Sequence, residues 1–149
     1  MSLEAKVMEE IKTAMRAKDE AALRTLRAIK AAILLEKTSG SGVNITEADE
    51  LKMLQKMAKQ RRDSLDIFTQ QNREDLAAKE REELAIIERF LPQQLNPEEL
   101  QAELKAIIAE IGASSPADMG KVIGVASKKL AGRADGKMIS ETVKQLLNS

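Results

Sequence analysis

Apolar residues recur along the whole chain at the spacing of an α-helix. In the first segment Leu3, Val7, Ile11 and Met15 each follow the last by about one helical turn. No segment shows the strict alternation of apolar and polar residues that is typical of a half-buried strand. The spacing therefore predicts an all-α protein without a β-sheet.

Polar residues that favour helix starts precede several of these segments. Ser2, Asp19 and Asn72 are each expected to cap a helix, and Thr46 with Asp49 resembles a capping box. The helix after Asp19 is expected to bury Leu23, Leu26, Ile29, Ile33 and Leu34. The Gly- and Ser-rich run 38–42 interrupts the helical spacing and predicts a flexible loop.

Two prolines mark the expected domain boundary. Pro92 and Pro97 enclose a short connector, and proline disfavours helix in the residue before it. We therefore expect an antiparallel helical N-terminal domain over residues 1–94 and a small three-helix domain over residues 95–149. In the second domain, helices are expected to start at Asn96, Ser115 and Asp135, and the first of them to stop at Gly112.

The composition excludes several classes of function. The chain has no cysteine and no histidine, which excludes disulfides, the usual zinc sites and a histidine proton shuttle. No phosphate-loop or nucleophile motif occurs, so we expect no catalytic residues, metal or cofactor. Charged residues near the N-terminus leave no apolar signal-peptide core, and no apolar run is long enough for a membrane. These features predict a cytoplasmic protein without a membrane partner.

Basic residues surround two closely spaced glycines near the C-terminus. From Gly112 onward the chain has six basic and three acidic residues, although the whole chain has no net charge. Gly120 and Gly124 lie about one turn apart, and Lys121 and Lys128 follow them around the helix. The candidate RNA-binding residues are Gly120, Lys121, Gly124, Lys128, Lys129, Arg133 and Lys137.

Each part of this region allows two interpretations. The glycines either let a neighbouring helix pack closely or expose backbone to a phosphate chain that the lysines contact. The turn between Gly132 and Lys137 either binds an anion at a helix start or joins two helices, with Asp135 as the cap. With two phenylalanines as its only aromatic residues, the chain lacks the platforms on which single-stranded bases stack.

Five segments together resemble the YqeY-like family. They are residues 24–30 (RTLRAIK), 60–64 (QRRDS), 90–95 (FLPQQL), 118–124 (DMGKVIG) and 132–136 (GRADG). The C-terminal part of this family is similar to the tail of GatB, a subunit of the tRNA-dependent amidotransferase. The resemblance implies an all-helical protein whose C-terminal domain binds tRNA, and it carries the family label of carbon–nitrogen ligase activity with glutamine as amido-N-donor.

Three functions follow as hypotheses. The first is an accessory module that binds tRNA or another structured RNA, beside a protein partner in tRNA amidation or translation. The second is an adaptor that docks a partner helix on the Gly120/Gly124 face without binding RNA. The third is a subunit with amidotransferase activity of its own. Binding through phosphates weakens steeply with salt and apolar docking does not, so the first two are separable.

Overall fold

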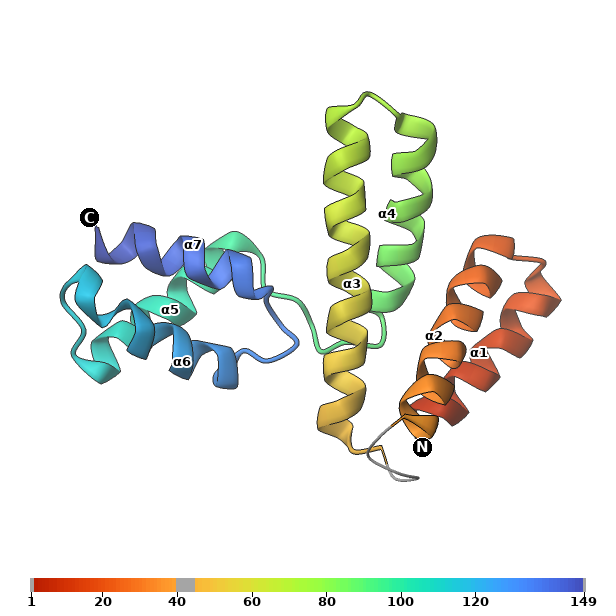
Figure 1. The fold of residues 1–149 in the computed structure, drawn as a ribbon, viewed down its shortest axis with the longest axis horizontal. Coiled ribbons are helices and arrows are strands. Elements are labelled where there is room, and N and C mark those ends of the chain that lie inside the picture. Colours follow the sequence, from red (N-terminus) through yellow and green to blue (C-terminus); the bar gives the residue numbers. More distant parts are fainter. Residues whose placement is uncertain (1, 40–44, 149) are drawn as a thin grey trace. The chain divides into compact units, whose positions relative to one another are not determined.

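The computed structural model describes residues 2–39 and 45–148, so most of the predicted loop over residues 38–42 lies outside the described residues. Within the described part the chain forms helices and no strands, which confirms the all-α prediction (Figure 1). The elements are α1 (Leu3–Ala17), α2 (Glu20–Thr38), α3 (Glu47–Gln70), α4 (Glu74–Glu88), α5 (Pro97–Ile111), the 3₁₀ helix η1 (Pro116–Asp118), α6 (Met119–Lys129) and α7 (Gly136–Leu147).

The helix starts follow the predicted caps with two exceptions, Ser115 and Asn72. Ser115 precedes the 3₁₀ helix η1 without a side-chain cap bond, and α6 itself begins only at Met119. Ser2 and Asp19 each accept a backbone N–H of the first turn, and Thr46 with Asp49 forms the capping box of α3. The prediction for Asn72 is wrong. This residue has a left-handed φ of 57° and lies in the turn between α3 and α4, a conformation that asparagine tolerates well. Arg73 takes the N-cap position instead, and its guanidinium pairs with Asp75.

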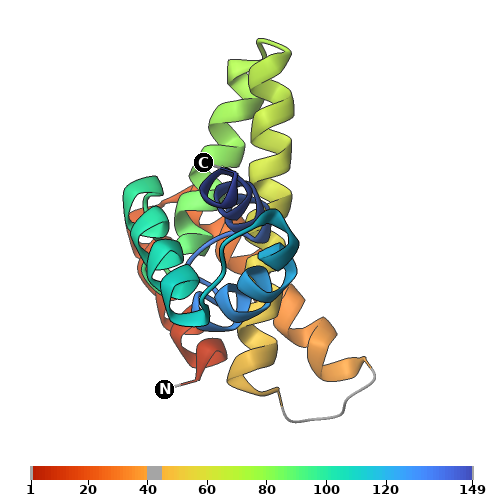
Figure 2. The same cartoon turned by 90° about the vertical axis from the view of Figure 1, so that its left-hand side faces the viewer.

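The chain divides into two compact units, Met1–Pro92 and Gln93–Ser149. In the N-terminal unit α1 packs against α2 and α3 packs against α4, and α2 joins the two pairs by contacting both α3 and α4. The α3–α4 pair extends past the α1–α2 pair (Figures 1 and 2).

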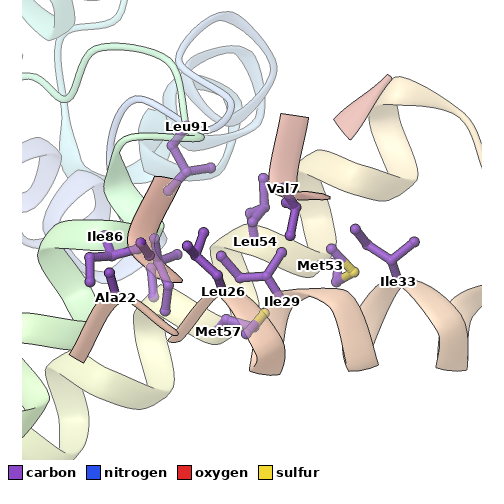
Figure 3. Close-up of a cluster of buried hydrophobic side chains, with 13 residues drawn as sticks. Val7, Ala22, Leu26, Ile29, Ile33, Met53, Leu54, Met57, Ile86 and Leu91 are labelled. Carbon is purple, nitrogen blue, oxygen red and sulfur yellow. The ribbon is translucent and has the colours of Figure 1, made fainter. Parts of the chain in front are cut away.

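A single cluster of apolar side chains holds the N-terminal unit together (Figure 3). Leu26 and Ile29 of α2 and Ile87 of α4 are almost fully buried at its centre. The other buried members are Val7, Ala14, Ala22, Ile33, Met53, Leu54, Met57, Ala58, Ile86 and Leu91. Leu34, which we expected in this core, is 50% exposed because it lies on the outer side of α2 beyond Ile33.

One carboxylate links three helices of the same unit. Glu83 of α4 lies 3.2 Å from Nε of Arg24 on α2 and 3.6 Å from Nε of Arg61 on α3. Glu83 and Arg61 are largely shielded from solvent, at 14% and 20% exposure, whereas Arg24 is exposed. Because α2 contacts both helices of the α3–α4 pair, this ion network reinforces the packing that the apolar core directs.

The C-terminal unit consists of α5, α6 and α7 around a core of its own (Figure 2). Its buried side chains are Leu100, Leu104, Ile107, Val122, Ala126, Leu130, Ile139, Val143 and Leu147. Asn96 caps α5 with Pro97 in its first turn, and Gly112 ends this helix with a left-handed φ of 78°.

The connector residues after Pro92 belong to this C-terminal unit. The Gln94 side chain donates to the carbonyl of Gly132, and the Leu95 N–H donates to the carbonyl of Arg133 over 2.9 Å. Gly132 can present its carbonyl in this way because it adopts a φ of 78° in the turn after α6. These bonds place the division at Pro92/Gln93, slightly before the expected boundary at residue 94.

Candidate nucleic-acid interface

Helix α6 exposes the face that carries both glycines. Val122 and Ala126 are fully buried against the other two helices, and Leu130 follows them one turn later. At about 100° per residue, Gly120 and Gly124 fall on the side of the helix away from these residues. Both are exposed.

Packing within the described residues does not require glycine at either position. A Cβ atom added to Gly120 or Gly124 would meet no other heavy atom within 4 Å among the residues that the structure describes. Glycine in a helix interior costs roughly 0.5–1 kcal/mol relative to alanine. Within the described part of the C-terminal unit, therefore, no neighbouring helix packs against these glycines.

Two lysines lie next to this strip of open backbone, on one side of it. Lys121 and Lys128 are both exposed and lie within about 20° of each other around α6. Lys128 forms no ion pair with any residue that the structure describes, whereas Lys121 is close enough to Asp118 to influence it. The backbone N–H groups of Ser114 and Ser115 and the positive charge of Lys121 lower the pKa of Asp118, so this carboxylate offsets part of the lysine's charge.

The structure gives two other candidate residues internal partners. The ammonium of Lys129 lies 2.9 Å from a carboxylate oxygen of Glu110 on α5, on another side of α6 from the glycines. Arg133 is partly buried, and its Nε donates to the carbonyl of Gln93 over 3.2 Å. Arg133 thus helps to hold the connector to the turn. The two contacts, Lys129 with Glu110 and Arg133 with Gln93, each join residues that are far apart in the sequence.

The turn before α7 is a capped helix start. The Asp135 carboxylate accepts the backbone N–H of Lys137 over 3.2 Å, as the capping interpretation predicts. An anion at this helix start would have to displace that carboxylate. Lys137 itself is exposed in the first turn of α7, and Lys144 lies on the same outward side of this helix.

The seven predicted residues thus form separate groups. Gly120, Lys121, Gly124 and Lys128 share one exposed face of α6, which we call the glycine–lysine face. Lys129, Arg133 and Lys137 lie on other surfaces of the same unit. The sequence could not reveal Glu110 as the partner of Lys129 or Gln93 as the partner of Arg133, because each partner is distant along the chain.

The described residues form neither a cluster of metal-binding groups nor a helix that could span a membrane. They contain no group of three or more acidic residues placed to hold a metal ion. Across residues 2–39 and 45–148, no helix has the length and apolar character needed to cross a membrane.

The fold and this surface define a class of protein: all-helical, with two units and an exposed glycine–lysine face. The family model of YqeY-like proteins matches residues 4–147, so the chain belongs to the YqeY-like family.

Three similar fungal proteins share the name "Altered inheritance of mitochondria protein 41, mitochondrial". The protein of Lachancea thermotolerans is 29% identical over 75% of this chain and 61% of its own length. That of Saccharomyces cerevisiae is 34% identical over 56% of this chain and 45% of its own length. That of Pyrenophora tritici-repentis is 24% identical over 97% of this chain and 80% of its own length. The match thus spans less than two thirds of the first two relatives.

These relatives contradict one prediction from the sequence. We expected a cytoplasmic protein, and the relatives are named as mitochondrial proteins. The expectation rested on the charged N-terminal segment, and charge in that segment argues only against a secretory signal peptide.

Proposed function

We propose that this protein is an accessory RNA-binding module, with tRNA as its expected RNA, that works beside the machinery of tRNA amidation or translation. The observation that carries the proposal is the open backbone of α6 beside two lysines. Positions 120 and 124 are glycine although packing within the C-terminal unit would allow alanine, which makes close approach of an outside group the best reason for Gly120 and Gly124. The relation of the family to the tail of GatB supports RNA as that group.

The composition favours recognition of the shape of a folded RNA. Without tryptophan or tyrosine the chain has few surfaces on which unstacked bases could lie. Lys121 and Lys128 can each contact a phosphate oxygen, and the glycine backbone beside them leaves room for the sugar–phosphate chain. Such contacts position an RNA without reading its sequence. The proposed module therefore prefers structured RNA and discriminates little between sequences.

A salt titration tests this proposal. Labelled bulk tRNA is titrated with the wild-type chain, the double variant Lys121→Ala/Lys128→Ala, Gly124→Ala, and the control Lys105→Ala on the exposed side of α5. Each phosphate contact that is lost should reduce the slope of log affinity against log salt by roughly 0.7–0.9. We expect a shallower slope for the double variant, weaker binding for Gly124→Ala, and no change for Lys105→Ala.

Two results would contradict the proposal. If the wild-type chain does not bind tRNA even at low salt, RNA is not its ligand, and the adaptor hypothesis replaces this one. If Lys105→Ala weakens binding as much as the double variant, the interaction is a general attraction between lysines and RNA. Release of glutamate from glutamine by the pure chain, abolished by one substitution, would instead support amidotransferase activity.

A further inference from the structure

The N-terminal unit carries a groove that the proposed RNA contacts do not use. Two adjoining hollows of about 490 and 550 Å³ share Leu3, Lys6, Phe90 and Pro92 as lining residues. One hollow extends toward the first turns of α3, and the other follows α1 as far as Thr13. Because they share these residues, we treat the two hollows as one surface, which we call the α1 groove.

The middle of the α1 groove is apolar. Leu54 forms part of the buried core beneath it, and Leu3, Leu51 and Phe90 are partly buried against that core, so each contributes apolar surface to the lining. Phe90 is one of only two aromatic residues in the chain. An aromatic ring beside leucines in a concave surface is typical of the pockets that hold the apolar anchor of a partner.

Carboxylates line both ends of the groove. Glu47 and Glu50 of α3 lie at one end, and Glu9 and Glu10 of α1 lie at the other. The hollow along α1 contains Glu9 and Glu10 together with Lys6 and Arg89, and Arg89 is paired with Glu10. The hollow toward α3 contains Glu47 and Glu50 with Lys6 alone, so the excess negative charge lies at the α3 end. The capping box of α3 uses Thr46 and Asp49, so Glu47 and Glu50 are not needed to close that helix start.

We propose that the α1 groove binds a peptide segment of a protein partner that has an apolar residue with lysine or arginine on one side of it. The apolar side chain would lie against Leu51 and Phe90, and the cation would meet Glu47 and Glu50 at the α3 end. Complementary charge of this kind speeds association and fixes the register of the bound segment. The proposal rests on the N-terminal unit alone and is independent of RNA binding by the C-terminal unit.

A random peptide library displayed on phage, selected against the intact chain, supplies the probe. We expect the enriched peptides to have an apolar residue with lysine or arginine on one side of it. One enriched peptide is then synthesised and titrated against the wild-type chain, Glu47→Gln/Glu50→Gln and Leu51→Ser. Each variant should weaken binding about tenfold or more. A version of the peptide with glutamate in place of its basic residues should not bind measurably.

Matched controls separate groove binding from other effects. Leu35→Ser removes an apolar side chain that is 67% exposed on α2, and it should leave peptide affinity unchanged. Lys121→Ala/Lys128→Ala should also leave it unchanged, while Glu47→Gln/Glu50→Gln should retain tRNA binding. Circular dichroism checks that Leu51→Ser folds, and the glutamine pair tests the groove without altering its apolar floor.

Three outcomes would overturn the proposal. The selection could enrich no peptides above those from a selection without the protein, or it could enrich peptides that lack basic residues. Alternatively, the enriched peptides could bind Glu47→Gln/Glu50→Gln and Leu51→Ser as tightly as the wild-type chain. Failure of tRNA binding alone would leave this proposal standing and would remove only the proposed RNA function.

Discussion

At the scale of single residues, the two exposed glycines of α6 weaken the helix that carries them. Alanine at either position has open space for its Cβ and a higher helix propensity. We expect Gly120→Ala and Gly124→Ala each to raise the free energy of unfolding by about 0.5–1 kcal/mol. Urea denaturation followed by circular dichroism measures this change. A loss of stability in either variant would show that packing does require the glycine.

Asp118 should make the C-terminal unit sensitive to acid. Backbone N–H groups and Lys121 lower the pKa of this carboxyl in the folded chain, so its ionised form stabilises the folded state. That contribution is present above the usual aspartate pKa and disappears as the pH falls through the lowered value, which places the loss below about pH 4. Asp118→Asn should therefore lose less stability than the wild-type chain over this range.

Urea denaturation at a series of acidic pH values tests this expectation. Glu141→Gln, on the exposed side of α7, is a suitable control because it removes an exposed carboxylate of the same unit, whereas the Asp118 carboxylate accepts the backbone N–H of Ser114. If the wild-type and Asp118→Asn curves remain parallel below about pH 4, the Asp118 carboxylate does not contribute in the way its contacts indicate.

At the scale of helices, Glu83 should contribute more to the stability of the N-terminal unit than an ordinary surface carboxylate does. Glu83→Ala would remove the carboxylate partner of the shielded Arg61, whereas the exposed Arg24 would keep Glu82 as a partner. We expect the free energy of unfolding to fall by about 1–2 kcal/mol, below the cost of breaking a fully buried pair. Thermal and urea denaturation measure it.

Another ion pair of α4 provides the matched control. Glu74 pairs with Arg81 over 2.9 Å, but both side chains are more than half exposed. Glu74→Ala should change the free energy of unfolding by less than about 1 kcal/mol, as is usual for exposed pairs. Equal effects of the two substitutions would mean that the shielding around Glu83 is unimportant.

The helices could be predicted well because their signals are local. Ser2, Asp19, Thr46 and Asn96 each form the expected cap, since a cap depends only on residues within one turn. The prediction for Asn72 was wrong because asparagine suits both a helix cap and a left-handed turn. In the short connection between α3 and α4 it adopts the turn.

The candidate interface could be predicted only in part. Helical spacing was enough to place Gly120, Gly124 and the flanking lysines on one face. It could not show that Lys129 pairs with Glu110, or that Arg133 holds the connector, because both contacts depend on tertiary packing. The α1 groove was missed for the same reason, since its lining comes from α1, α3 and the segment after α4.

At the scale of the whole molecule, the hydrogen bonds of the connector determine where the C-terminal unit begins. A fragment that starts at Gln93 keeps the bonds from Gln94 and Leu95 to the turn after α6, and one that starts at Asn96 loses them. We expect the longer fragment to be more stable by about 1–2 kcal/mol, from two or three hydrogen bonds of ordinary strength. Urea denaturation of both fragments measures the difference, and equal stabilities would contradict it.

The bond from Leu95 to Arg133 also makes one amide an indicator of motion. The Leu95 N–H lies outside every helix, yet it is held by a carbonyl in the turn between α6 and α7. In hydrogen–deuterium exchange, its protection can be lost only when this turn releases the connector or the unit unfolds. If this amide exchanges faster than buried amides of the three helices, the difference therefore reports opening of the turn while the helices remain folded.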